Sequence, residues 1–361
     1  MKVKNKVIVF SAVVSALLWG VLAANGFEQA LSLTAALTLL IAILWVTEAL
    51  PIPVTSLIPF VAFPMAGVID YKEAASALGS HVILLLMGAF MLSKALEKSG
   101  VHRRIAVYML RLCGASSAKR LVLGFMLTSA VLSMWISNTA TTLMLLPIAM
   151  AIITSMNSPK LAAALLLGIA YSASLGGVGT PIGTPPNIIF MSVYQQTTGT
   201  ELSFINWMMT GVPIVLIAIP IMAFWLTRKL SDMPDCDLPK AGDWRPAEKR
   251  VLIVFGIVAL AWIFRPYWSV WTGMTLVSDS TIAIAGVVLM FLVPNGDKEK
   301  PDQLLDWKTT EAIPWGMLLL FAGGICMAKA FTASGLSLLL GEALTGLSAL
   351  PIVLTLLVLC L

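Results

Sequence analysis

Two polar segments stand out in an otherwise strongly apolar chain, and both carry oxygen atoms that suit small cations. SNT at residues 137–139 lies within 121–159, which contains no charged residue, and GTPPN at 183–187 has the Gly and Pro residues that interrupt a helix. Hydroxyl, amide and freed carbonyl oxygens are hard ligands suited to Na⁺, while helix N-termini favour anions. Without Lys or Arg, these segments would need a bound cation before they could hold a dianion.

No group of residues indicates an enzyme or a cofactor site. No His, Cys or carboxylate cluster lies near the polar segments, and 121–159 lacks a titratable acid or base. The four cysteines are scattered without metal-ligand spacing. The glycines of 176–183 miss the spacings that cradle phosphates. We therefore expect no enzymatic activity and no organic cofactor.

The composition indicates a protein embedded in lipid. Of 361 residues, 59% are hydrophobic and 11% charged, whereas soluble domains carry about 25% charged residues. We expect an all-α polytopic membrane protein. The net charge of +5 does not indicate nucleic-acid binding, because cytoplasmic loops of membrane proteins collect Lys and Arg.

Apolar segments of spanning length set out the expected helices. They lie near 7–24, 30–49, 53–70, 79–97, 207–228, 250–267, 278–294 and 313–331. The first could be a signal peptide, but its length and the spans that follow favour an uncleaved span. A shorter segment, 101–113, resembles an interfacial helix with Arg103, Arg104 and Arg111 on a solvated face.

The positions of Lys and Arg predict the orientation. With the N-terminus in the cytoplasm, 19 of the 23 basic residues fall in inside segments. Region 118–158 then enters and leaves on one face, either as two spans or as a re-entrant hairpin with SNT at its tip. Region 160–194 is either one span broken at GTPPN or a loop between two short spans.

An internal repeat relates two distant segments. Residues 84–100 and 319–335 align without a gap, with seven identities in seventeen positions, including Lys94 with Lys329 and Gly100 with Gly335. The predicted topology runs them in opposite directions, which is typical of inverted-repeat transporters. Ser137 follows Gly100 by 37 residues, so a second tip should lie near position 372. We therefore expect a C-terminally truncated sequence whose second repeat is incomplete, lacking roughly a hundred residues.

Four segments together resemble the divalent anion/sodium symporter family. They are WVTEALPIPVTSLIP (45–59), SMWISNTATT (133–142), GGVGTPIGTPPN (176–187) and IPWGMLLLFAGG (313–324). The resemblance covers nearly the whole chain. It implies a homodimer that moves substrate by an elevator mechanism, and it favours the re-entrant hairpin for 118–158.

The resemblance also implies roles for individual residues. The substrate-binding residues it implies are Ser137, Asn138, Thr139 and Thr184. The sodium ligands it implies are Ser133, Ser137, Asn138 and Gly183, and Ser133 lies one helical turn before Ser137. Pro185, Pro186 and Asn187 would support the loop.

These expectations combine into one organisation. The predicted parts are an N-terminal span at 1–29, a first inverted repeat at 30–228 with the hairpin 118–158 and the broken helix 160–194, a cytoplasmic linker at 229–249, and an incomplete second repeat at 250–361. The predicted location is the bacterial cytoplasmic (inner) membrane.

The predicted function is sodium-coupled import of C4-dicarboxylates such as succinate, malate and fumarate. A sodium-independent dicarboxylate exchanger, a sulfate or citrate transporter, and a non-transporting membrane scaffold are the alternatives. Sodium dependence of uptake separates the first alternative from the main prediction.

Overall fold

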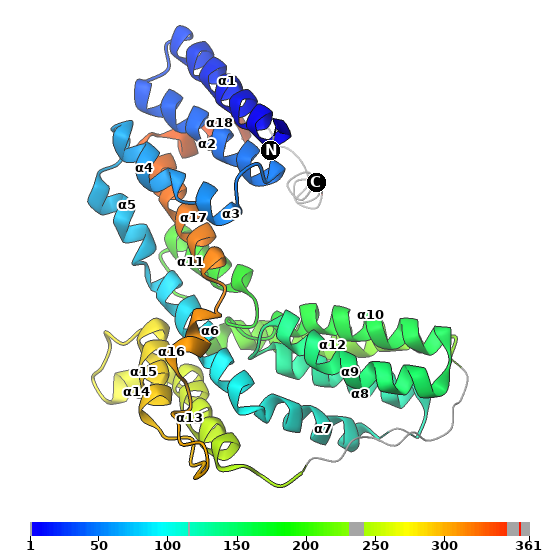
Figure 1. The fold of residues 1–361 in the computed structure, drawn as a ribbon. Coiled ribbons are helices and arrows are strands. Elements are labelled where there is room, and N and C mark those ends of the chain that lie inside the picture. Colours follow the sequence, from blue (N-terminus) through cyan, green and yellow to red (C-terminus); the bar gives the residue numbers. More distant parts are fainter. Residues whose placement is uncertain (1, 115, 231–241, 345–353, 355–361) are drawn as a thin grey trace. The chain divides into compact units, whose positions relative to one another are not determined.

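The computed structural model describes residues 2–114, 116–230, 242–344 and 354, and these residues are mostly helical (Figure 1). Within them, the extended pairing is one isolated β-bridge between Pro294 and Gln303. The chain forms two compact units. The first unit is Met1–Ile83 with Pro314–Leu361, and the second is Leu84–Ile313.

The first unit joins the beginning of the chain to a helix from its far end. Its helices are α1 (Lys2–Ala24), α2 (Gln29–Thr47), α3 (Ile52–Thr55), α4 (Ile58–Met65), α5 (Tyr71–Leu78), α17 (Trp315–Ala333) and α18 (Leu336–Leu344). A buried apolar cluster joins α4, α5 and α17 through residues that include Phe63, Ala77 and Cys326. Van der Waals packing between such residues is a main force that holds helices together in lipid.

The predicted span at 53–70 is interrupted in the structure. The chain forms α3 and α4 with a break at Ser56 and Leu57 instead of one continuous helix. Pro59 follows the break at the second position of α4. Proline has no N–H to donate and is tolerated in the first turn of a helix, so it favours a new start there over continuation.

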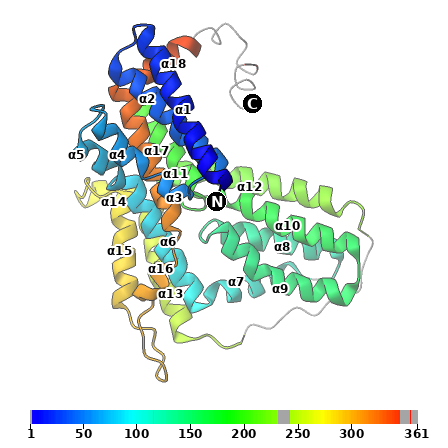
Figure 2. The same cartoon turned by 45° about the horizontal axis from the view of Figure 1, so that its top comes forward.

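The second unit contains both polar segments. Its helices are α6 (His81–Ser99, which begins in the first unit), α7 (Val101–Cys113), α8 (Ala118–Ser133), α9 (Asn138–Met156), α10 (Pro159–Gly177), α11 (Pro185–Thr198), α12 (Phe204–Thr227), α13 (Pro246–Ile263), α14 (Arg265–Trp271), α15 (Asp279–Leu292) and α16 (Trp307–Glu311). Helices α8, α9, α10 and α12 lie side by side (Figures 1 and 2).

The helices confirm a polytopic all-α membrane protein. Seven helical stretches of the described residues are long and apolar enough to cross a membrane, or eight if one bent pair counts as a span. That pair is α13 and α14, which meet at an angle of 80°. The sequence predicted a single apolar span at 250–267, but Pro266 lacks the N–H that would continue the α13 hydrogen-bond ladder, so the helix ends at Ile263.

Both copies of the repeat end in the same local structure. Gly100 after α6 and Gly335 after α17 have φ angles of +78° and +75°, and a new helix begins at the next residue in each case. This left-handed conformation costs glycine little because it has no Cβ. The shared Ser-Gly ending of the two copies therefore specifies a helix–turn–helix corner.

The helix α7 follows the predicted range, but its predicted solvated face is wrong at Arg104. Arg104 is buried and forms an ion pair with Glu248, while Arg103 is exposed. Tyr108 and Leu112 on the same helix are exposed as well. The partner that draws Arg104 inward lies 144 residues further along the chain, beyond the reach of a local pattern.

Candidate functional site

The first polar segment forms the tip of a helical hairpin. Helix α8 ends at Ser133, four residues follow, and α9 begins at Asn138. Ser137 is the N-cap of α9, and its hydroxyl accepts a hydrogen bond from the backbone N–H of Ala140 at 3.2 Å. This cap satisfies a backbone donor that the first turn of a helix otherwise leaves free. The remaining free N–H groups of that turn make the tip favourable for negative charge.

The hairpin brings two predicted sodium ligands into direct contact. Ser133 is fully buried at the end of α8, and its hydroxyl donates to the side-chain oxygen of Asn138 at the start of α9. Ser137 and Thr139 flank Asn138 and are exposed. The tip therefore has a part-buried pair of oxygens with two accessible hydroxyls beside it.

The second polar segment interrupts a helical path. Helix α10 ends at Gly177 and α11 begins at Pro185, with residues 178–184 between them. The buried Asn187 holds this turn, since its amide donates to the carbonyls of Gly177 and Thr180, both at 2.8 Å. Pro185 and Pro186 open α11 and are partly buried and exposed, respectively. Asn187 thus supplies hydrogen bonds that the broken helix cannot make for itself.

The tip and the break converge at Gly177. A Cβ placed on this glycine would lie 3.1 Å from the Asn138 side-chain oxygen, 3.3 Å from the Gly183 carbonyl oxygen and 3.4 Å from the Thr184 Cβ. Asn138, Gly183 and Thr184 therefore surround one small region. Sequence reasoning selected these three residues from two segments more than forty positions apart, and the fold brings them together.

Close helix packing fixes this convergence. A Cβ on Gly176 would lie 2.3 Å from the Ala130 carbonyl oxygen, so α10 approaches the α8 backbone as closely as only glycine permits. The hydroxyl of Ser129 on α8 donates to the Ile169 carbonyl of α10 at 2.9 Å. Small residues and interhelical hydrogen bonds of this kind are typical of packing between membrane helices.

Sequence reasoning missed one residue that ties the break to the tip. The buried Thr180 donates its hydroxyl to the Met134 carbonyl, directly after Ser133. The signal was present, since GTPIGTPP contains GTP twice and only the second copy was selected. The buried hydroxyls of Thr141 on α9 and Ser172 on α10 have no hydrogen-bond partner among the described residues.

Aromatic packing holds the tip from the other side. The Trp135 ring stacks on Phe204 with centroids 6.2 Å apart and meets Phe255 edge-on at 5.5 Å. Phe204 in turn stacks on the buried Trp262 at 5.2 Å. Trp135 therefore positions the hairpin through ring contacts that add to its apolar burial.

The chemistry available at the convergence is that of neutral oxygens. In the described part of the chain, no cluster of His, Cys, Asp or Glu is placed to hold a metal ion. The oxygens of Ser133, Ser137, Asn138 and Gly183 are those that Na⁺ accepts beside unwound helix ends. The residues present fit a sodium ion, and the first turns of α9 and α11 fit an anionic group.

The apolar helices define a multi-pass membrane protein, and a polar helix tip beside a broken helix is typical of transporters. A sequence model described as citrate transporter (CitMHS) matches residues 42–361, so the chain belongs to this family.

Its relatives include sodium-dependent dicarboxylate transporters. SdcS of Staphylococcus saprophyticus is 39% identical over 345 residues, which cover 88% of this chain and 66% of the relative. SdcS of Staphylococcus aureus is 37% identical over 336 residues, which cover 87% of this chain and 64% of the relative. The chain thus spans just under two thirds of their length. The resemblance to sodium-coupled anion transporters is confirmed.

Proposed function

We propose that this protein imports C4-dicarboxylates, such as succinate, malate and fumarate, coupled to sodium. The observation that carries the proposal is the contact of Ser133 with Asn138 next to the Gly183 carbonyl and Thr184. This contact supports a site in which sodium-type ligands lie beside an anion-favouring helix start. The names of the SdcS relatives support sodium and a dicarboxylate as the transported pair.

The proposed sodium site uses the oxygens of Ser133, Ser137, Asn138 and the Gly183 carbonyl. The Ser133 hydroxyl can rotate so that its lone pairs, instead of its proton, face an ion. Asn138 then presents its oxygen to the same ion. A sodium ion held here places positive charge at the start of α9, beside the exposed hydroxyls of Ser137 and Thr139.

The proposed carboxylate site uses Ser137, Asn138, Thr139 and Thr184. Their hydroxyl and amide groups donate hydrogen bonds, and the N-terminal ends of α9 and α11 add partial positive charge. Neither polar segment contains Lys or Arg, so the desolvation of a carboxylate is offset by Na⁺. This dependence is the proposed basis of coupling.

The family resemblance supports further parts of the proposal. We place the protein in a bacterial cytoplasmic membrane as a lipid-embedded homodimer, with the N-terminus inside and the hairpin re-entering the bilayer. Movement of the site by an elevator mechanism belongs to the same proposal. We assign no enzymatic activity, organic cofactor or nucleic-acid partner. Citrate is the second candidate substrate, because the matching family is described as citrate transporter.

Uptake into vesicles tests this function. The full-length protein in liposomes is expected to accumulate labelled succinate with external Na⁺ and not with choline. Asn138→Ala removes an oxygen from both proposed sites, so uptake should fall by at least about a hundredfold, the cost of roughly two lost charge-assisted contacts. Asn206→Ala, which truncates an exposed amide on α12, is the matched control and should keep full uptake.

The uptake assay also separates the alternatives. Equal uptake in choline would identify a sodium-independent exchanger, and preference for citrate or sulfate would change the substrate. Normal uptake by Asn138→Ala would place the site elsewhere. If the full-length protein takes up none of these anions, the non-transporting scaffold is the alternative that remains.

A further inference from the structure

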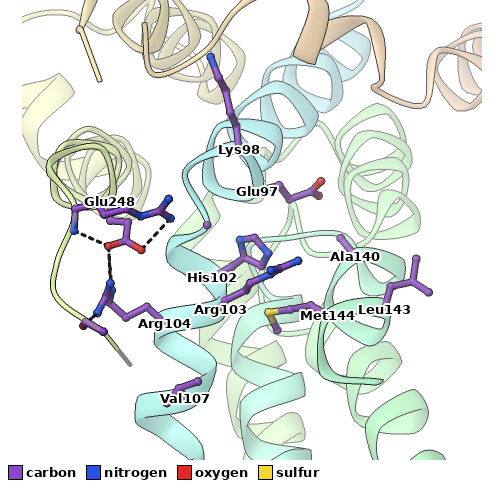
Figure 3. A pocket seen from close by; sticks show the side chains of 13 residues that line it. Glu97, Lys98, His102, Arg103, Arg104, Val107, Ala140, Leu143, Met144 and Glu248 are labelled. Atoms are coloured by element: carbon purple, nitrogen blue, oxygen red, sulfur yellow. Dashed lines mark hydrogen bonds and ion pairs between the residues drawn. The ribbon is translucent and has the colours of Figure 1, made fainter. Parts of the chain in front are cut away.

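A large polar cavity lies in the second unit beside the hairpin. It has a volume of about 730 Å³, within the range of small-ligand pockets. Residues from the end of α6, from α7, from the first turns of α9 and from the start of α13 line it (Figure 3). None of the residues selected for the sodium and carboxylate sites belongs to this lining.

The cavity adjoins the candidate site through α9. Ala140, Leu143 and Met144 follow the hairpin tip on one face of that helix and line the cavity. The N–H of Ala140 donates to the hydroxyl of Ser137, so the cavity wall and the tip share a hydrogen bond. An anion in the cavity would lie next to the helix start that is proposed to hold its carboxylate.

Most charged side chains in the cavity wall are already paired. Glu97 binds Lys94 at 2.6 Å, and Lys98 binds Asp302 at 2.6 Å. Glu248 accepts from Arg104 and also pairs with Arg245. These contacts pair most of the acidic and basic side chains of the cavity wall.

Arg103 is the exception among the described residues that line the cavity. Its side chain is exposed and has no ion-pair or hydrogen-bond partner in the described part of the chain. Figure 3 shows it extending toward Met144 and Ala140, on the opposite side of α7 from Arg104. His102 beside it is buried, and burial lowers the pKa of its imidazole, so the ring is neutral near pH 7.

We propose that this cavity is a vestibule for the transported dicarboxylate, in which Arg103 binds a carboxylate before it reaches or after it leaves the hairpin tip. The inference rests on the proposed function. The planar guanidinium of arginine matches a carboxylate with two parallel hydrogen bonds. The apolar Leu143 and Met144 face the carbon chain between the two carboxylates.

A single arginine favours a carboxylate over a phosphate headgroup of a lipid. The planar guanidinium forms two parallel hydrogen bonds with one carboxylate, whereas sites for lipid headgroups are commonly clusters of several Lys or Arg. Among the described residues of this lining, Arg103 is the unpaired cation, and Glu97 lies in the same cavity wall. A weak site of this kind suits an anion that must also leave.

Transport kinetics test the role of Arg103. In full-length protein in liposomes, Arg103→Gln should raise the KM for succinate about tenfold, the effect of one lost charge-assisted contact, with kcat within about twofold. Arg103→Lys keeps the charge but not the planar guanidinium, so its KM for succinate should lie between those of the wild type and Arg103→Gln. The control is Arg120→Gln, an exposed arginine bound to Ser116 outside the cavity, which should match the wild type.

The kinetic outcomes separate the two proposals. If uptake is sodium-dependent and Arg103→Gln has the KM of the wild type, the vestibule is overturned and the proposed function stands. A wild-type protein without sodium-dependent uptake overturns both. A fall in kcat with unchanged KM would also overturn the vestibule, since it would indicate a role in movement and not in anion binding.

Chemical labelling tests the site without transport. Phenylglyoxal modifies accessible arginines, and succinate should slow its reaction with Arg103 at least about threefold while leaving Arg120 unaffected. The protection should persist in Asn138→Ala, because the vestibule does not use that residue. Protection that disappears in Asn138→Ala, or that phosphatidylglycerol nanodiscs give and succinate does not, would overturn the proposal.

Discussion

The hairpin tip and the contact of Arg104 on α7 with Glu248 on α13, called the corner from here on, both contain buried polar groups. The two features satisfy these groups in opposite ways. At the tip, Ser133 and Asn138 are neutral and bind each other beside exposed hydroxyls. At the corner, Arg104 and Glu248 are charged, nearly inaccessible and 2.9 Å apart. The guanidinium of Arg104 also donates to the carbonyls of Gly242 and Asp243 and lies over the Trp244 ring.

This difference separates a binding site from a fixed structural joint. The Arg104 guanidinium is engaged by a carboxylate, two backbone carbonyls and an aromatic ring, and contacts of this number and strength fix its position. The tip keeps oxygens that can exchange a hydrogen bond for a cation at little cost. At the tip, a bound cation would strengthen the attraction of the neutral donors for an anion, so we expect anion binding there to depend on the cation.

The largest expected effect on stability comes from breaking the corner. Glu248→Ala leaves the Arg104 charge buried without its carboxylate and should cost about 3–5 kcal/mol of folding free energy. Thermal unfolding in detergent measures the loss. Arg245→Gln, which removes the more exposed partner of Glu248, should cost less than about 1 kcal/mol.

A double replacement sharpens the same point. Arg104→Met with Glu248→Leu removes both charges and should recover most of the stability that Glu248→Ala loses. If the single and double variants unfold at the same temperature, the ion pair is not the reason that Glu248 matters.

A smaller effect is expected where α10 meets α8. Gly176→Ala places a methyl group within 2.3–2.7 Å of Ala130 backbone atoms, so the helices must separate. We expect a loss of about 1–3 kcal/mol together with weaker succinate binding, because the same helices carry Gly177 and Ser133. Gly256→Ala is the control, since nothing lies within 4 Å of its added Cβ. Equal melting temperatures for the two variants would show that the close approach is not needed.

The smallest effect concerns an ion pair at the surface. The hydrogen bond from Lys98 lowers the pKa of Asp306 to about 2, and Lys98 also lowers the pKa of Asp302. A depressed carboxyl pKa contributes stability above its unfolded value near 4, and this contribution is lost as the pH falls toward 2. Asp306→Asn should therefore reduce the loss of folding free energy between about pH 4 and pH 2, by less than about 1 kcal/mol. The melting temperature of the variant should accordingly fall less steeply over this pH range.

The matched control for this pair is Glu299→Gln, which removes an exposed carboxylate from the same segment between α15 and α16. It should retain the wild-type pH profile in that window. A profile for Asp306→Asn that also coincides with the wild type would mean that the pair adds nothing measurable.

Local patterns explain which parts of the fold were predictable. The apolar runs of α1, α2, α12 and α17 are long and uninterrupted, so hydropathy sufficed to find them. The Gly and Pro residues of 176–187 marked the broken helix in the same way. At 53–70 and 250–267 the apolar runs concealed breaks, because hydropathy gives Pro59 and Pro266 too little weight.

The candidate site was predictable only in part. Ser137 and Asn138 stand out because polar residues are rare in such a stretch, and the family pattern supplied Ser133 and Gly183. Thr180 was missed because its role depends on a contact with Met134, 46 positions earlier. The burial of Arg104 was missed for the same reason, since Glu248 is 144 positions away. Contacts of this kind are set by tertiary packing and leave no periodic signal.

Succinate binding with and without sodium tests the central claim most directly. Thermal unfolding of the full-length protein in detergent measures it, since a ligand at a hundred times its Kd stabilises the folded state by about 2.7 kcal/mol. Our account predicts that succinate raises the melting temperature in Na⁺ and not in choline. It also predicts that Ser133→Ala lowers the affinity for Na⁺, so that a higher Na⁺ concentration is needed for the same shift in melting temperature. An equal rise in choline and in Na⁺ would contradict the account.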